Sequence, residues 1–121
     1  MIDEEIHRRS FERDVWRHRR KAGYMLTIPG DSLSDRLRAS GALQTARWRI
    51  SNEGLYRLDL CALFINGKER HAIEQSIIRF GTRGLLFTKD QVAVAEGRLL
   101  AMQAHYMKHP ELLRKNQTWI G

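Results

Sequence analysis

The chain of 121 residues is 42% hydrophobic and 29% charged, which is enough apolar material for one core and excludes both a two-domain chain and a wholly disordered one. The formal net charge of +7 favours anionic partners and argues against mimicry of DNA. The single cysteine, Cys61, excludes an intramolecular disulfide and a multi-cysteine zinc site, and a reducing cytoplasm is the expected location. No apolar run approaches the roughly 18 residues that cross a bilayer, so we expect no membrane partner.

A basic helix is predicted over residues 1–22. Residues 3–5 are acidic and the stretch "RHRRK" is basic, which complements the helix dipole at both ends, and Gly23 stops the helix. Capping explains the basic cluster, yet four basic residues in five exceed what capping needs, so a nucleic-acid-binding arm is the second interpretation. The cluster consists of Arg17, Arg19, Arg20 and Lys21.

Residues 24–41 are predicted to form a short strand and a short helix, separated by a turn. Residues 24–28 are a strand candidate that ends at Pro29-Gly30, and residues 32–40 form a short helix that Gly41 terminates.

Two longer strands are predicted to form an antiparallel hairpin. In "LQTARWRIS", residues 43–51, Trp48 and Ile50 share one face while Arg47 and Arg49 share the other. The turn "NEG" leads into "LYRLDLCALFI", residues 55–65, where the same alternation places Arg57 and Asp59 opposite the apolar residues.

Residues 66–81 fit two structures. As a strand, Asn66-Gly67 makes the turn and the beta-branched residues of "SIIRF" continue the sheet, which is the favoured interpretation. As a helix, Asn66 is the cap, an apolar stripe includes Ile73 and Ile77, and Gly81 ends it. A further short strand is expected at residues 84–87.

The last element is a helix over residues 88–109, with Thr88 and Gln91 as a capping box. Pro110 cannot continue it and suits the first position of a further turn. The expected fold is therefore α+β: the N-terminal helix, a small antiparallel sheet of three to five strands within residues 42–87, and the C-terminal helix packed on the sheet. Its apolar stripe covers the sheet or, as the alternative, pairs with a second copy; the stripe comprises Val92, Ala95, Leu99, Met102 and Tyr106.

Catalytic and metal motifs are absent from the sequence, so we expect no cofactor and favour a protein that is not an enzyme. His105 and His109 have the spacing of two metal ligands on one helical face, but no third ligand is evident. His71 is a candidate general base, with a place on the sheet as the preferred alternative. Asp59 lies next to Arg57 on one strand face, which an ordinary ion pair explains.

Two stretches resemble known families. "RGLLFTKDQVAVAEGRL" resembles the strand-to-helix junction of positive-cofactor-four-type single-stranded-DNA-binding proteins, with Arg83, Gly84, Thr88 and Gln91 carrying the match. "ARWRISNEGLYRLDL" is similar to the arginine-bearing strands of RelE-type ribonuclease toxins, and that resemblance implies RNA cleavage by Arg47, Arg49, Arg57 and His71.

The sequence thus predicts a small basic nucleic-acid-binding protein that contacts phosphates of single-stranded DNA or RNA with arginines on a sheet face and on the N-terminal helix. The alternatives are a RelE-like ribonuclease toxin and a phage or mobile-element-type inhibitor or adaptor that binds an acidic protein surface. The apolar terminus "TWIG" and the region from Met102 to Met107 are candidate contacts for such docking or for a homodimer. The candidate nucleic-acid-binding residues are Arg17, Arg19, Arg20, Lys21, Arg47, Arg49, Arg57, Arg79 and Arg83.

Overall fold

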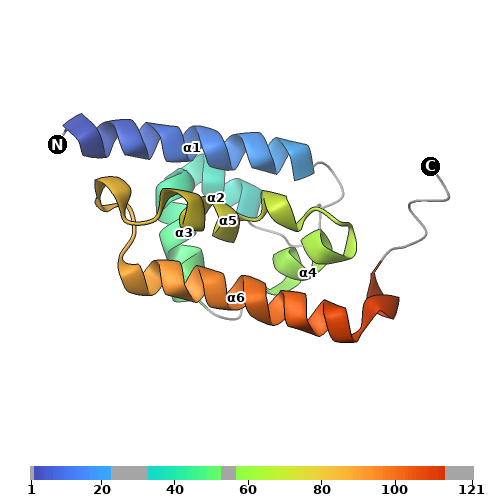
Figure 1. Ribbon diagram of the computed structural model, residues 1–121. Helices are drawn as coiled ribbons and strands as arrows, with labels where there is room; N and C mark the ends of the chain where they lie inside the picture. The colour runs from blue at the N-terminus through green and yellow to red at the C-terminus, as the bar shows by residue number, and fades with distance from the viewer. Residues whose placement is uncertain (1, 23–32, 53–56, 114–121) are drawn as a thin grey trace.

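The computed structural model describes residues 2–22, 33–52 and 57–113, and these residues form helices only (Figure 1). The predicted α+β class and its antiparallel sheet are therefore wrong, since the described residues contain no strand. The elements, with η for a 3-10 helix, are α1 (Ile2–Ala22), α2 (Leu33–Ser40), α3 (Ala42–Ser51), α4 (Arg57–Ile65), η3 (Glu69–His71), α5 (Ile73–Phe80), η4 (Arg83–Leu85), α6 (Lys89–Lys108) and η5 (Pro110–Leu112).

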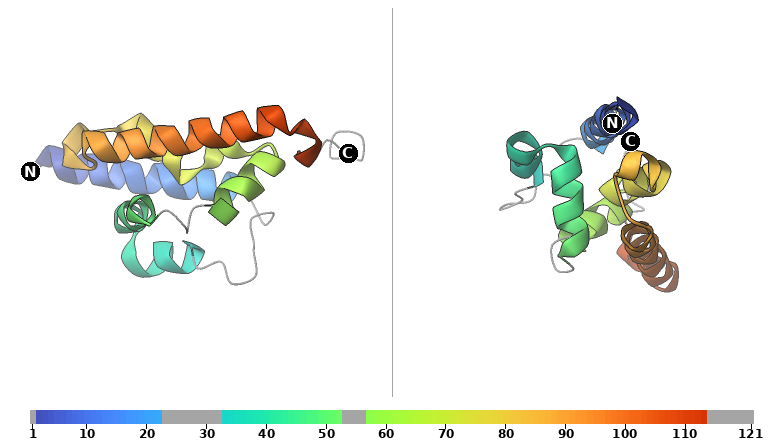
Figure 2. Two further views of the ribbon diagram at one scale, coloured as in Figure 1. Left: turned by 90° about the horizontal axis from the view of Figure 1, so that it is seen from below. Right: turned by 90° about the vertical axis from the view of Figure 1, so that its left-hand side faces the viewer.

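The two long helices frame the molecule. Helices α1 and α6 run in the same direction along opposite sides, and α5 lies between them (Figures 1 and 2). Helix α3 contacts α1, α5 and α6. Helix α2 packs on α3, on the side away from α6 (Figure 2). The C-terminal helix thus packs on other helices, mainly α5, rather than on a sheet.

The core is built around Phe11 of α1, which is fully buried. Its ring meets Phe80 at 5.4 Å and Phe87 at 5.2 Å, both edge to face, a geometry that aromatic quadrupoles favour. Aliphatic side chains from α2, α3, α5 and α6 complete this cluster, and a second cluster lies around Leu60 and Leu63 of α4. Every described α-helix contributes to one of the two clusters.

Helix α3 occupies the first predicted strand. The segment alternates over Ala46, Trp48 and Ile50, but Ala42, Ala46 and Ile50 also recur every four residues, and these three are buried. Trp48 lies outside that stripe, under the guanidinium of Arg36 at 3.5 Å from the ring centroid. Alanine, leucine, glutamine and arginine are good helix formers, so local propensity and tertiary burial agree on a helix here.

The second and third predicted strands are also helical. In α4, Leu60 and Leu63 are buried three residues apart, whereas the strand interpretation placed them on opposite faces. In α5, the stripe of the helical alternative is the correct one: Ile73 and Ile77 are buried and Gly81 ends the helix with φ of +56°. Asn66 does not cap that helix, because its side chain donates to the Ala62 carbonyl at the end of α4. Residues 84–87 contain η4 in place of the predicted strand.

The predicted helices at both ends and at residues 32–40 are confirmed as α1, α6 and α2. Thr88 and Gln91 form the predicted capping box, with Gln91 N donating to Thr88 Oγ1 at 3.1 Å and Thr88 N donating to Gln91 Oε1 at 2.8 Å. Pro110 opens η5 as expected. The strand candidate at residues 24–28 lies outside the described residues.

Gly84 lets the chain pass close to α1. Its φ is +60°, and an added Cβ would lie 2.7 Å from Cβ of His7. Only glycine combines this positive φ with such close approach without strain. Gly84, which the family resemblance placed at a strand-to-helix junction, therefore lies in a tight 3-10 turn.

The capping box yields a stability prediction. We expect Thr88→Ala to lower the free energy of unfolding by about 1 kcal/mol, because the Gln91 amide loses its acceptor. Thr88→Ser keeps the hydroxyl and serves as the control. Urea denaturation followed by circular dichroism measures both; equal stability of Thr88→Ala and the parent chain would show that the box contributes nothing.

Candidate functional site

The arginines predicted to form one exposed row have different structural roles. Arg49 is 2% exposed and is among the largest fully buried side chains of the described residues. Its Nε and Nη2 donate to the two carboxylate oxygens of Glu74, each at 2.8 Å, in a bidentate pair. Its Nη1 donates to Asp59 Oδ2, also at 2.8 Å. One guanidinium from α3 therefore holds a carboxylate from α5 and another from α4.

Two further arginines extend this network to α1 and α6. Arg19 of α1 donates to the second oxygen of Asp59 at 3.0 Å. Arg98 of α6 donates to the backbone carbonyls of Arg49 and Ile50 at 3.0 Å each, and its Nη1 lies 3.8 Å from Glu74. Five helices thus meet in one buried polar cluster.

The charges in this cluster stabilise one another. Burial alone would raise the pKa of the Asp59 carboxyl, but the guanidinium groups of Arg49 and Arg19 outweigh that effect and lower it. Burial would likewise lower the pKa of Arg49, whereas Glu74 and Asp59 raise it above its ordinary value. Arg49 and Asp59 therefore both remain charged at neutral pH, and the first role of the cluster is to hold the helices together.

The other arginines of the predicted sheet face do not form a row either. Arg47 donates to the Leu86 carbonyl at 3.0 and 2.8 Å and to the Leu85 carbonyl at 3.4 Å, so it ties α3 to the segment after η4. Arg57 begins α4, and its side chain lies outside the described part of the structure. A nucleic-acid interface on a sheet face, predicted for Arg47, Arg49 and Arg57, is therefore wrong, since the described residues offer no sheet and Arg49 is buried.

The two family resemblances fail for the same reason. The resemblance to single-stranded-DNA-binding proteins needs a strand at Arg83 and Gly84, which lie in η4, although its helix cap at Thr88 and Gln91 is present. The resemblance to RelE-type toxins needs strands where the structure has α3 and α4. Arg49, which the toxin resemblance assigns to RNA cleavage, has its donors taken by Glu74 and Asp59. No finding supports a phage or mobile-element inhibitor.

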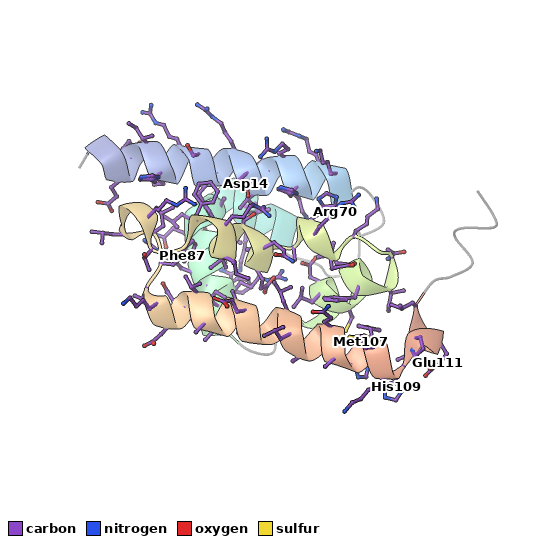
Figure 3. All side chains as sticks on the ribbon, in the orientation of Figure 1. Asp14, Arg70, Phe87, Met107, His109 and Glu111 are labelled. Carbon is purple, nitrogen blue, oxygen red and sulfur yellow. The ribbon has the colours of Figure 1, made fainter. Side chains whose placement is uncertain are left out.

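A second polar cluster joins α1 to α5 around Asp14, which lies on the side of α1 that faces α5 (Figure 3). Asp14 Oδ2 accepts from Ser76 Oγ at 2.7 Å and from Arg79 Nη2 at 2.6 Å, and Oδ1 accepts from Arg17 at 3.0 Å. Burial would raise the pKa of Asp14, but these donors lower it. Arg83 donates to the Arg79 carbonyl at 2.8 Å.

Two histidines meet where α1 packs on η3. Nδ1 of His18 lies 2.8 Å from Nδ1 of His71, so one imidazole donates and the other accepts. Burial, followed by neighbouring positive charges, lowers the pKa of both histidines. His71, the candidate general base, is thus one half of an interhelical hydrogen bond.

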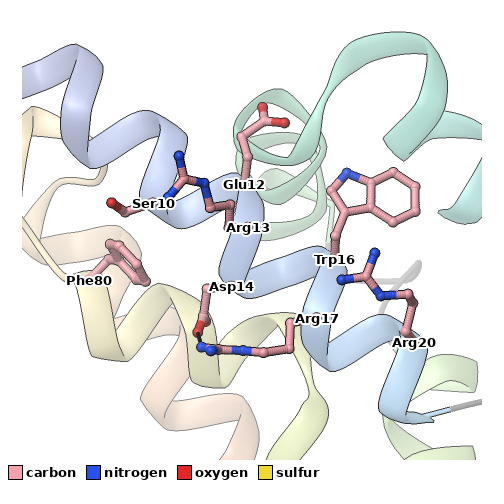
Figure 4. Close-up of a pocket in the computed structure, with 8 residues that line it drawn as sticks. All are labelled: Ser10, Glu12, Arg13, Asp14, Trp16, Arg17, Arg20 and Phe80. Carbon is pink, nitrogen blue, oxygen red and sulfur yellow. Dashed lines mark hydrogen bonds and ion pairs between the residues drawn. The ribbon is translucent and has the colours of Figure 1, made fainter.

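The basic end of α1 also presents an exposed surface. Arg13, Arg17 and Arg20 recur at i, i+4 and i+7 on the solvent side, and among the described residues Arg13 and Arg20 have no ion-pair partner. The adjacent Lys21 is exposed as well. Together with Ser10, Glu12, Asp14, Trp16 and Phe80, these three arginines line an open depression of about 680 Å³ (Figure 4).

Sequence reasoning thus placed the N-terminal basic residues on the correct helix but missed their partners. Asp14, Glu74 and Arg98 carry the buried networks, and none was a candidate. The sequence does contain a signal that Arg98 is buried. Arg98 lies beside Leu99 and three residues after Ala95, on the apolar side of α6. A charged residue inside an apolar stripe indicates a buried ion pair.

The two histidines with the spacing of metal ligands, His105 and His109, lie at the C-terminal end of α6. The rings of His105 and His109 lie 5.0 Å apart, and His109 Nδ1 is 3.4 Å from Glu111. Within the described ranges, no three histidine, cysteine or carboxylate side chains gather in a metal-binding arrangement.

Comparisons with protein-family models, with curated protein sequences and with solved structures give no match to this chain. None of the described helices combines the length and the apolar character needed to cross a membrane.

The Arg49 cluster gives the second prediction. We expect Arg49→Met to lower the free energy of unfolding by about 3–5 kcal/mol, because Glu74 and Asp59 stay buried without their shared counter-ion. Urea denaturation at neutral pH measures the change. The control is Arg13→Met, an exposed arginine on α1, for which less than about 0.5 kcal/mol is expected. A similar loss in both variants would contradict a structural role for the Arg49 cluster.

The histidine pair gives a pH prediction. An unfolded histidine has a pKa of about 6.5, and the folded values are lower, so below that pH the unfolded chain binds more protons than the folded one. Stability contributed by the pair is therefore present above pH ~6.5 and is lost as the pH falls through the folded values. Melting temperatures between neutral and mildly acidic pH should show this loss in the parent chain and less of it in His18→Gln/His71→Gln.

The matched control is His105→Gln/His109→Gln, which removes two exposed histidines of α6 and its cap. This variant should keep the pH dependence of the parent chain. If the two double variants behave alike between neutral and mildly acidic pH, the His18–His71 pair does not carry the effect.

Proposed function

We propose that this protein is a binding module that docks on an acidic protein surface through the exposed basic face of α1. The observation that carries the proposal is the row Arg13, Arg17 and Arg20, three guanidinium groups beside one open depression. Two of them have no ion-pair partner within the described residues, so they can bind a carboxylate without first breaking a contact.

The preorganisation of this face supports docking. Arg79 of α5 donates to Asp14 of α1 and fixes the border between the two helices, while Arg17 donates to the other oxygen of Asp14. The Arg17 side chain is still 59% exposed, so it keeps free donors while its position is held. The backbone under the row belongs to one long helix that the Phe11 cluster anchors, and a rigid surface loses little entropy on binding.

The mixed lining of the depression favours a protein over a nucleic acid. Glu12 and Asp14 share the surface with the arginines, and carboxylates repel a phosphate backbone. Trp16 and Phe80 supply aromatic edges, and tryptophan and arginine are enriched at the centres of protein interfaces. An acidic protein with apolar side chains between its carboxylates has the matching chemistry.

Binding without catalysis is part of the proposal. The carboxylates of Asp14, Asp59 and Glu74 accept hydrogen bonds from guanidinium donors, so their oxygens are engaged within the scaffold rather than open to a substrate. His18 and His71 engage each other. The buried charged side chains therefore stabilise the fold, and the exposed arginines of α1 bind the partner.

Charge reversal tests the proposal. The probe is a fluorescently labelled acidic peptide rich in glutamate and leucine, measured by anisotropy against the parent chain and against Arg13→Glu/Arg20→Glu. We expect the variant to bind the peptide at least about tenfold more weakly, because two attractive charges become repulsive.

The matched control is Lys89→Glu/Lys108→Glu, which reverses the same number of exposed charges on α6, on the opposite side of the molecule from α1. If this control still binds the peptide, binding depends on the α1 face and not on net charge. Equal loss in both variants would mean that net charge alone drives binding. Tighter binding of single-stranded DNA of equal charge than of the peptide would overturn the choice of a protein partner.

A further inference from the structure

The side of α6 that faces away from the core is apolar. Ala93, Gly97, Leu100, Ala104 and Met107 recur at spacings of four, three, four and three, and we call these five residues the outer stripe. The stripe is turned by about 180° from the buried side of the helix. Leu100 is 64% and Met107 75% exposed, and an added Cβ on Gly97 would meet nothing within 4 Å.

The position of α6 leaves this stripe accessible. The helix forms one edge of the molecule (Figure 1), and Met107 on it is exposed. The core contacts of α6 are made by its other side, where Ala95, Leu99 and Tyr106 are buried. A heptad of small and large apolar residues on an exposed helix is the pattern of a helix-pairing seam rather than of a solvated face.

The sizes of the stripe residues fit a second copy of the same helix. When two α6 helices are placed antiparallel with their full lengths of about 30 Å overlapping, Gly97 of one copy lies opposite Leu100 of the other. Ala93 then lies opposite Ala104. Each of these two central layers therefore includes a small side chain, which allows close approach of the two helices, while Met107 lies level with Asp90 near the helix end.

The charges beside the stripe fit the same register. In an antiparallel two-fold pair, each flank of the stripe meets the same flank of the other copy. Asp90 and Lys108 share one flank, and full overlap brings Asp90 of each copy opposite Lys108 of the other. On the other flank, Glu96 comes opposite Gln103. Asp90, Glu96, Gln103 and Lys108 are all exposed, so these contacts need no rearrangement of the fold.

From this complementarity we propose that two copies of the chain associate through the outer stripe of α6, antiparallel and in the register that overlaps the whole helix. The surface lies on the opposite side of the molecule from the α1 face, so dimerisation leaves that face open. A single helix pair covers less than the roughly 800 Å² per partner of a standard interface, so the dimer dissociates on dilution. Two copies of the α1 face would then act together on one partner.

Light scattering coupled to size-exclusion chromatography, over a series of concentrations of the full chain, tests the pairing. The parent chain is expected to shift from monomer to dimer as its concentration rises. Leu100→Glu should raise the dimer dissociation constant at least tenfold, because it places two carboxylates at the centre of the seam. Ile6→Glu, at a side chain of α1 that is 54% exposed, is the matched control and should leave dimerisation unchanged.

A mixing experiment tests the register. Asp90→Lys alone and Lys108→Asp alone should each weaken the dimer, since each places like charges opposite each other. An equimolar mixture of the two variants should regain parent-like dimerisation, because both contacts become complementary in the heterodimer. Circular dichroism and melting temperatures verify that each variant is folded. A monomer at every concentration, a dimer insensitive to Leu100→Glu, or a mixture no better than its components would overturn the proposal.

Discussion

The buried guanidinium of Arg49 holds carboxylates from α4 and α5 at 2.8 Å, and the arrangement of the other helices depends on this contact. A buried ion pair is stable only where every donor and acceptor is matched, and here Arg19 of α1 satisfies the remaining oxygen of Asp59. Arg98 of α6 adds bonds to the carbonyls at the end of α3. Because the five helices must all be in place for these bonds to form, the cluster specifies one packing among many that a short helical chain could adopt.

The basic character of the chain is divided between scaffold and surface. Arg49 and Arg98 are almost fully buried, and Arg47 donates to backbone carbonyls, so these three guanidinium groups belong to the scaffold rather than to an exposed basic surface. Within the part of the chain that the structure describes, the C-terminal half of α1 carries the exposed arginines Arg13 and Arg20, which have no ion-pair partner there. The two long helices therefore present different surfaces to solvent: exposed cations on α1, and the exposed apolar residues Leu100 and Met107 on α6.

Prediction from sequence succeeded where an element was long and its end signals were independent of the rest of the fold. Thr88 and Gln91 lie three residues apart and cap α6 by themselves, and the apolar stripe that follows fits only a helical period. It failed over α3 and α4. There, Ala46 and Ile50 fit the period of a strand and that of a helix equally well, and the segments are too short for either period to prevail.

The sequence by itself determined the two long helices, the capping box of the second one, and a basic excess that begins on the first helix. Only the tertiary structure decided which arginines are buried. An arginine carries the same charge wherever it lies, and its burial becomes favourable only when carboxylates converge on it. The partners of Arg49 come from positions 10 and 25 residues further along the chain, and no local pattern brings them together. Arg49, which the sequence placed in an exposed binding row, therefore lies at the centre of the scaffold, where α3, α4 and α5 meet.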